Sequence, residues 1–98
     1  MAYSLIWSPT ARSDFRDLVQ YISEFDPDAA ERFGNRIFHA LESLYTFPDS
    51  GRIVPEFRDP ALRELIRKPC RIVYRVDQER SCIHIVRIWH AARGIPEI

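Results

Sequence analysis

The chain has 98 residues, of which 46% are apolar, and its 14 basic residues balance 14 acidic ones. This length suits one domain with a single hydrophobic core, and the apolar fraction excludes a disordered tail. No apolar run approaches the roughly 20 residues that span a bilayer, and residues 1–9 lack the basic and long apolar regions of a signal peptide. We therefore expect one cytoplasmic domain over residues 1–98, without membrane contact.

The two halves of the chain carry opposite charge. Residues 1–50 hold four arginines against eight acids, whereas residues 51–98 hold ten basic residues against six acids. Thirteen of the fourteen cations are arginine, and Lys68 is the exception. Because arginine grips phosphate or carboxylate with a planar fork, the composition favours an anionic partner. The alternative is an arginine-rich surface that only meets solvent.

The first half reads as a strand followed by two helices. Residues 3–7 are aromatic and branched, which predicts a strand. Ser8-Pro9 and Asp26-Pro27 each combine an N-cap residue with a proline at the first helical position. Apolar residues at helical spacing extend the first helix to about Glu24 and the second to Phe47-Pro48. The short connection makes the helices an antiparallel hairpin.

The second half reads as three strands. Residues 51–61 contain two prolines and predict a loop, and residues 91–98 predict a loose C-terminal tail. Runs of branched and aromatic residues predict strands at residues 62–67, 70–76 and 81–89. The order β-α-α-β-β-β predicts an α+β fold in which a helical hairpin packs on one face of a mostly antiparallel sheet.

The last two strands present different faces. If Val76 pairs with Ser81, one face is apolar and suits the helices. It comprises Ile72, Tyr74, Val76, Ile83 and Ile85. The other face mixes branched, arginine and histidine side chains, which suits a partner: Arg71, Val73, Arg75, His84, Val86, Ile88 and His90. Arg87 falls on the apolar face, which indicates either a bulge or a snorkelling side chain.

The two cysteines predict neither a disulfide nor a zinc site. In the expected register Cys70 lies opposite Arg87 and Cys82 lies opposite Arg75, so the thiols do not face each other. The pair has no CxxC spacing, and nothing else in the chain forms a metal cluster or a phosphate-binding glycine loop. We expect no metal and no cofactor.

Several motifs together resemble a known family. They are Trp7-x-Pro9-x-Ala11, Leu44-x-x-Phe47-Pro48-x-x-Gly51-Arg52, Arg63-Glu64-Leu65, Arg71-Ile72-Val73-Tyr74-Arg75-Val76 and Ile88-x-His90-x-x-Arg93. In order and spacing the chain is similar to the ParE-like (plasmid stabilisation) toxins of the RelE/ParE superfamily of type II toxin–antitoxin systems. The resemblance implies the same β-α-α-β-β-β fold. No single motif is specific, but together they cover almost the whole chain.

The resemblance also implies a function, with two alternatives. ParE-like toxins poison DNA gyrase and arrest growth, whereas RelE-like relatives are metal-free ribonucleases that cut messenger RNA on the ribosome. Both are neutralised by a cognate antitoxin, ParD-like or similar, in a hetero-oligomer. We expect the gyrase poison, because of the Arg63-Glu64-Leu65 and Ile88-x-His90-x-x-Arg93 motifs and because the chain has one lysine only. By the same resemblance, ribosome-bound relatives have a lysine-rich surface. A third possibility is a non-toxic protein of the same fold that acts only as a partner in a complex.

The candidate site residues differ between the two activities. The gyrase poison needs no catalytic residue. Its expected contacts with target and antitoxin are Arg63, Arg67, Arg71, Arg75, Trp89, His90 and Arg93. A ribonuclease would use His90 as acid or base, Glu56 as base and Arg71 for the phosphate. With Arg71 opposite Val86, His90 lies about 13 Å further along the strand. The alternative for His90 is a strand-end residue that closes a local hydrogen bond.

Overall fold

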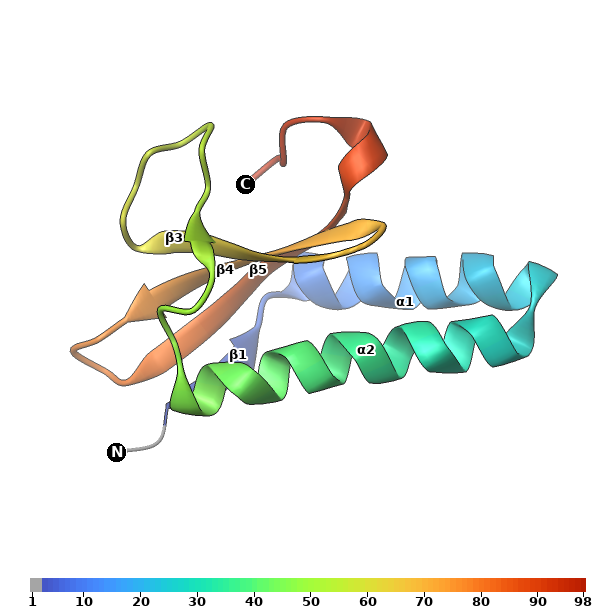
Figure 1. Ribbon diagram of the computed structural model, residues 1–98, viewed down its shortest axis with the longest axis horizontal. Helices are drawn as coiled ribbons and strands as arrows, with labels where there is room; N and C mark the ends of the chain where they lie inside the picture. The colour runs from blue at the N-terminus through green and yellow to red at the C-terminus, as the bar shows by residue number, and fades with distance from the viewer. Residues whose placement is uncertain (1–2) are drawn as a thin grey trace.

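The computed structural model describes residues 3–98, so the first two residues of the predicted domain lie outside the described part. Over those residues the chain forms one sheet and a helical hairpin (Figure 1). The elements are β1 (Ser4–Trp7), α1 (Pro9–Phe25), α2 (Pro27–Thr46), β2 (Arg52–Ile53), β3 (Leu62–Arg67), β4 (Cys70–Asp77), β5 (Cys82–His90) and the short helix η1 (Ala91–Arg93). Neither α1 nor α2 is long and apolar enough to cross a bilayer.

Both helices begin at the residues that the sequence predicts. The Ser8 side chain accepts a hydrogen bond from the backbone N–H of Ala11 at 3.0 Å. The Asp26 carboxylate accepts from the N–H groups of Asp28 and Ala29 at 3.1 and 3.2 Å. These caps satisfy N–H groups that lack partners within the first helical turn. Asp26 therefore ends α1 and begins α2, which makes the hairpin connection one residue long.

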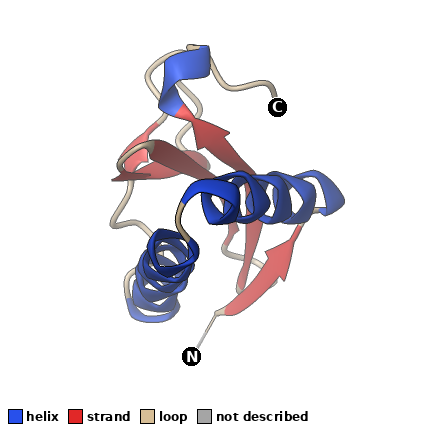
Figure 2. Cartoon of the chain, turned by 90° about the vertical axis from the view of Figure 1, so that its right-hand side faces the viewer, coloured by secondary structure: helices blue, strands red, loops and turns tan. Residues whose placement is uncertain are grey.

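The sheet has the order β1-β5-β4-β3-β2, with β1 parallel to β5 and the other pairs antiparallel. In Figure 2 the connection between the helices faces the viewer and the strands lie behind them. The core lies between the hairpin and one face of the sheet. It includes the five residues predicted to share the apolar face: Ile72, Tyr74, Val76, Ile83 and Ile85. The α+β architecture expected from the sequence is confirmed.

The predicted register of the last hairpin was wrong. Val76 pairs with Ile83 rather than Ser81, a shift of two residues that leaves the faces near the turn unchanged. Between Val73 and Tyr74 the register shifts by one more residue, at a β-bulge. A one-residue shift exchanges the faces beyond it. Ile88 consequently joins the core opposite Ile72, and the bulge accounts for the misfit of Arg87.

Two segments are more ordered than the sequence suggests. Residues 51–61, expected to be loop, contain the two-residue strand β2, paired with β3. The segment 91–98, predicted to be a loose tail, begins with η1 and turns back over the sheet. The Gly94 carbonyl oxygen accepts hydrogen bonds from Trp89 Nε1 at 3.1 Å and from Arg71 at 3.3 Å, and Pro96 is buried. The segment predicted to be a loose tail is thus held to the sheet at Gly94 and Pro96, and its other residues are exposed.

Replacing Gly34 by alanine is expected to raise the free energy of unfolding by about 0.5–1 kcal/mol, because glycine in a helix interior is unfavourable. Gly34 lies within α2, and an added Cβ would approach Phe15 Cζ no closer than 3.7 Å, an ordinary contact. Urea unfolding of both proteins measures the difference. A lower midpoint in Gly34→Ala would mean that the helix interface tolerates no added methyl group.

Candidate functional site

The sheet face opposite the helices is partly covered by the segment between β2 and β3. Val54 packs there in a small apolar cluster with Leu62 and Val73, and Val86 packs against it. This cluster holds residues 54–60 over the sheet and brings Glu56 above β4. The covered face is therefore the place where the loop, the strands and the C-terminal segment meet.

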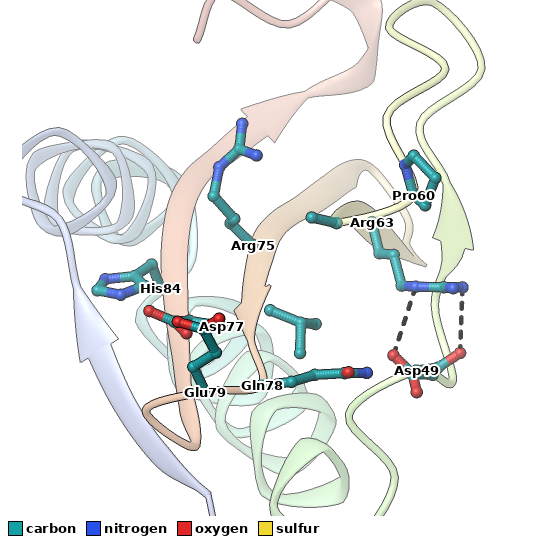
Figure 3. A pocket seen from close by; sticks show the side chains of 10 residues that line it. Asp49, Pro60, Arg63, Arg75, Asp77, Gln78, Glu79 and His84 are labelled. Carbon is teal, nitrogen blue, oxygen red and sulfur yellow. Dashed lines mark hydrogen bonds and ion pairs between the residues drawn. The ribbon is translucent and has the colours of Figure 1, made fainter.

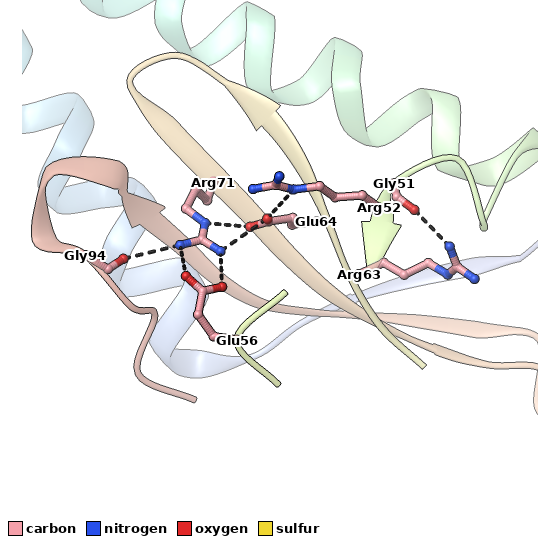
Figure 4. A network of polar contacts seen from close by, with 7 residues as sticks. All are labelled: Gly51, Arg52, Glu56, Arg63, Glu64, Arg71 and Gly94. Carbon is pink, nitrogen blue, oxygen red and sulfur yellow. Dashed lines mark hydrogen bonds and ion pairs between the residues drawn. The ribbon is translucent and has the colours of Figure 1, made fainter. Parts of the chain in front are cut away.

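A network of four charged side chains lies at this meeting point (Figure 4). Arg71 binds both oxygens of Glu56, with N–O distances of 3.0 and 2.7 Å. Its Nε donates to Glu64 at 2.6 Å, and Arg52 donates to the other oxygen of Glu64 at 2.7 Å. Two arginines thus balance two carboxylates. We call Arg52, Glu56, Glu64 and Arg71 the central network.

The electrostatics of the central network follow from this pairing. The hydrogen bonds from Arg71 hold the pKa of Glu56 below its ordinary value. The same bonds, to Glu56 first and then Glu64, raise the pKa of Arg71. Glu64 is only 1% exposed and Arg71 only 8% exposed, so neither charge is available to solvent. Arg71, predicted to contact a partner, is buried within the central network in this structure.

Acidification is expected to destabilise the fold through Glu56. An acid whose folded-state pKa is lowered stabilises the fold above its unfolded-state pKa, and this contribution is lost as the pH falls through the folded-state pKa. For Glu56 the loss begins near its ordinary pKa of 4.5 and continues below it. Urea unfolding measured between pH 7 and pH 3 should show it. Glu56→Gln should depend less on pH, and an unchanged dependence would contradict this assignment.

Trp89 is buried beneath the C-terminal segment and helps to hold that segment in place. The ring is 2% exposed, and its Nε1 donates to the Gly94 carbonyl oxygen. The guanidinium carbons of Arg87 and Arg93 lie 4.7 and 4.1 Å from the ring centroid, within cation–π range. Trp89, predicted to contact a partner, therefore lies beneath the arginine that is exposed, Arg93.

β1 pairs with β5 only as far as Ile85, and side chains from α1 and its N-cap bind the backbone of β5 beyond that point. Beyond it Ser8 Oγ donates to the Val86 carbonyl, and Asp14 accepts from the Ile88 N–H. Asp14 also binds Arg87 through two N–O contacts of 2.8 and 2.9 Å. The hydrogen bonds of a strand edge are thus partly replaced by side chains of α1, and Arg87 is held away from the core.

His90 does not meet the other candidate catalytic residues. It pairs with Cys70, on the helix side of the sheet, whereas Arg71 pairs with Trp89 on the opposite face. The predicted pairing of Arg71 with Val86, and the separation derived from it, were wrong. His90 Nδ1 accepts a hydrogen bond from the Ala92 N–H at 3.1 Å, which caps η1. The structure thus brings Glu56 and Arg71 together and leaves His90 on the other side of the sheet.

Arg63 and Arg75 line a cavity of about 590 Å³ at the end of the sheet near the β4–β5 turn (Figure 3). Arg63 donates to the Gly51 carbonyl and lies 3.6 Å from Asp49, and Arg75 binds Asp59 at 2.9 Å. Three acids share the walls with these arginines and His84: Asp49, Asp77 and Glu79. The cavity therefore has mixed charge and both arginines have carboxylate neighbours.

Arg67 lines a different cavity, on the flank between α2 and β3. Its walls are formed by Asn35, Arg36, His39, Ala40, Ser43 and Arg67, and its volume is about 470 Å³. Neither Arg36 nor His39 is among the residues that the sequence predicts for the site. Their spacing of three residues places them on one side of a helix, but only the fold shows that this side meets Arg67.

An apolar groove runs along the opposite flank of α2. It has a volume of about 360 Å³ and is lined by Leu5, Trp7, Phe38, Leu41, Glu42 and Tyr45. Phe38 and Tyr45 are 50% and 44% exposed. Exposed aromatic side chains beside an edge strand are typical of a protein-binding surface. We call these six residues the apolar groove.

Among residues 3–98, no group of three His, Cys, Asp or Glu side chains is placed to hold a metal ion. Cys70 and Cys82 are both free thiols, as the sequence predicts. Burial raises the pKa of the Cys70 thiol to about 11. A thiol with so high a pKa is a poor nucleophile, so Cys70 belongs to the core.

Comparisons with known proteins find toxins of both the ParE and the RelE name. Residues 5–95 match the family model of the ParE toxin of the type II toxin–antitoxin system parDE. Toxin RelE2 of Caulobacter vibrioides is 36% identical over 89 residues, covering 91% of this chain and 96% of the relative.

Solved structures share the fold. A chain of the chromosomal ParDE toxin–antitoxin system of P. aeruginosa is 25% identical with a TM-score of 0.70, covering 91% of this chain and 96% of that chain. A chain of the toxin–antitoxin complex RelBE2 of Mycobacterium tuberculosis has the same fold, with 22% identity, a TM-score of 0.63 and coverage of 92% and 99%. With the family model matching nearly the whole described fold, the chain belongs to the ParE toxins of type II toxin–antitoxin systems, within the RelE/ParE superfamily.

Proposed function

We propose that this type II toxin arrests growth by binding DNA gyrase and trapping its cleaved DNA complex, without chemistry of its own. The observation that carries the proposal is the separation of the candidate catalytic residues. Glu56 and Arg71 neutralise each other within the central network, while His90 lies on the other face of the sheet. A ribonuclease needs an acid, a base and a free cation around one phosphate.

The exposed candidates supply the contacts in this proposal. Arg63, Arg67, Arg75, His90 and Arg93 keep some exposure, whereas Arg71 and Trp89 are buried and fix the segment that carries Arg93. Arg93 is exposed and stacked over Trp89, so its guanidinium is ordered before a target arrives. An ordered contact residue loses less conformational entropy on binding than a free one.

The second candidate is a ribosome-dependent ribonuclease that cuts messenger RNA. It is favoured by the name of the relative RelE2, to which this chain is 36% identical. This activity would require Arg71 to leave two carboxylates, or other arginines to bind the phosphate. A protein that only forms a complex, without toxicity, is the third candidate.

We also propose that a cognate antitoxin binds the apolar groove with an amphipathic helix and the edge of β1 with an extended segment. Support comes from the two solved relatives, which belong to the toxin–antitoxin systems ParDE and RelBE2. The groove presents half-exposed aromatic rings, and β1 has a free edge in the described sheet. Helix-in-groove docking and strand addition use these two features.

The test is pulsed expression of the wild type, His90→Ala and Arg93→Ala in a host without the antitoxin. Filamentation, an SOS response and intact messages are the expected result for the wild type. Arg93→Ala should lose toxicity. If His90→Ala is still toxic, its toxicity should again be accompanied by SOS induction. In addition, incubation of the purified wild type with gyrase and supercoiled plasmid should yield linear plasmid DNA after detergent treatment.

Other outcomes separate the alternatives. Rapid cleavage of messages that His90→Ala abolishes would move the chain to the ribonucleases. Normal growth with a folded wild-type protein would favour the non-toxic partner. In that case calorimetry with the neighbouring gene product would still test the apolar groove, using Phe38→Ala with exposed Phe47→Ala as the control.

A further inference from the structure

The cavity between α2 and β3 differs in charge from the other cavities that contain arginine. Its polar lining groups are the side chains of Asn35, Arg36, His39, Ser43 and Arg67, all of types that can donate a hydrogen bond. The Ser43 hydroxyl donates to the Ala40 carbonyl oxygen. No carboxylate is among the residues that line it in the described part of the chain. Lys68 follows Arg67 directly and is exposed at the β3–β4 turn. We call this site the basic cavity.

The two arginines of the basic cavity lack acidic partners. Within residues 3–98, neither Arg36 nor Arg67 has a carboxylate oxygen within 4.0 Å, and the same holds for the exposed Arg58 and Arg80. The arginines between β2 and β5 that do have one are Arg52, Arg63, Arg71, Arg75 and Arg87. Arg67 donates only to the carbonyl of Ile66, and Arg36 lies 6.0 Å from the ring centroid of Phe33. In a chain with no net charge, these cations remain available to an anion from outside.

The arrangement suits a polyanion with regularly spaced charges. Ser43 lies seven residues after Arg36 in α2, about 10 Å along the helix axis, and His39 lies between them. A DNA strand carries one phosphate per about 3.4 Å of duplex axis, but it winds around that axis, so consecutive phosphates lie further apart than this rise and about two fit this length. Arginine, amide and hydroxyl donors are the groups that bind DNA backbones in proteins. The exposed aromatic rings that suit a peptide lie on the opposite flank of α2, in the apolar groove.

We propose that the basic cavity binds the phosphate backbone of duplex DNA, with Arg36 and Arg67 as the principal contacts. The inference rests on the proposed function, because a toxin that traps gyrase on cleaved DNA meets both protein and DNA. It adds that this chain touches the DNA itself. The apolar groove and the basic cavity lie on opposite flanks of α2, so antitoxin and DNA are expected to use separate surfaces.

The experiment measures binding of a labelled duplex of about 20 base pairs to the purified toxin by fluorescence anisotropy, over a range of salt concentrations and without gyrase. Arg36→Glu/Arg67→Glu is expected to weaken binding at least tenfold and to reduce the salt slope of log K by about two. The matched control is Arg12→Glu/Arg80→Glu, which has the same charge change at two exposed arginines outside the cavity. It should keep the wild-type slope.

Folding is checked by near-ultraviolet circular dichroism, and Arg36→Gln/Arg67→Gln serves as a milder variant. Equal weakening in both charge-reversal pairs would overturn the proposal, because it would reflect net charge alone. Cavity-dependent binding that favours RNA over duplex DNA would also overturn it, as would loss of antitoxin binding with unchanged DNA binding. Failure to trap gyrase with intact, cavity-dependent DNA binding would overturn the proposed function but support the basic cavity.

Discussion

Replacing Arg71 by alanine is expected to lower the free energy of unfolding by about 3–5 kcal/mol, the usual effect of breaking a buried ion pair. The change removes the one side chain among residues 3–98 that joins both carboxylates of the central network and the Gly94 carbonyl. Glu64 is 1% exposed and would retain only Arg52, whose own side chain is mostly in solvent. Urea unfolding at pH 7 measures the loss.

Arg75→Ala is the matched control for Arg71→Ala. It removes the same charge from the same strand, but Arg75 and its partner Asp59 are 43% and 41% exposed. Exposed ion pairs contribute about 1 kcal/mol or less. If the two alanine variants lost equal stability, the burial of the central network would not be what stabilises the fold. Arg71→Lys should lie between them, since an ammonium group cannot bind Glu56 through two parallel bonds.

The helices were predictable because their signals are local. Ser8 and Asp26 set the start of each helix through hydrogen bonds that span three residues at most. The apolar face of β4 and β5 was also correct near the turn, because side chains alternate with a period of two and an error of two residues preserves that alternation.

The candidate site was less predictable because it depends on a bulge and on distant partners. The bulge near Val73 moves Ile88 and His90 to the helix side of the sheet, and nothing in the local pattern gives its position. The pairing of Arg71 with Glu56 joins residues 15 apart across the loop that Val54 anchors. Seven arginine, histidine and tryptophan candidates could be selected by type, but their division into exposed and buried residues required the fold.

Replacing Gly51 by alanine is expected to destabilise the fold by about 3 kcal/mol, at the upper end of the usual cost of overpacking. An added Cβ would lie 2.5 Å from the Glu64 carbonyl oxygen and 2.6 Å from the Tyr74 hydroxyl. The carbonyl belongs to the β2–β3 pairing and cannot withdraw without moving the strand that carries Glu64. The hydroxyl accepts the Gly51 N–H at 2.9 Å, so its displacement would leave a buried donor unpaired.

A double-mutant cycle with Tyr74→Phe separates the two contacts of Gly51. Tyr74→Phe alone should cost about 1–3 kcal/mol, because the buried Gly51 N–H loses its acceptor. In the double variant the methyl group no longer meets the hydroxyl, so the combined loss should be smaller than the sum of the single losses. Strict additivity would assign the whole effect to the backbone of Glu64. Arg52 follows Gly51 and pairs with Glu64. That result would therefore mean that the β2–β3 register, rather than the Tyr74 hydrogen bond, positions the central network.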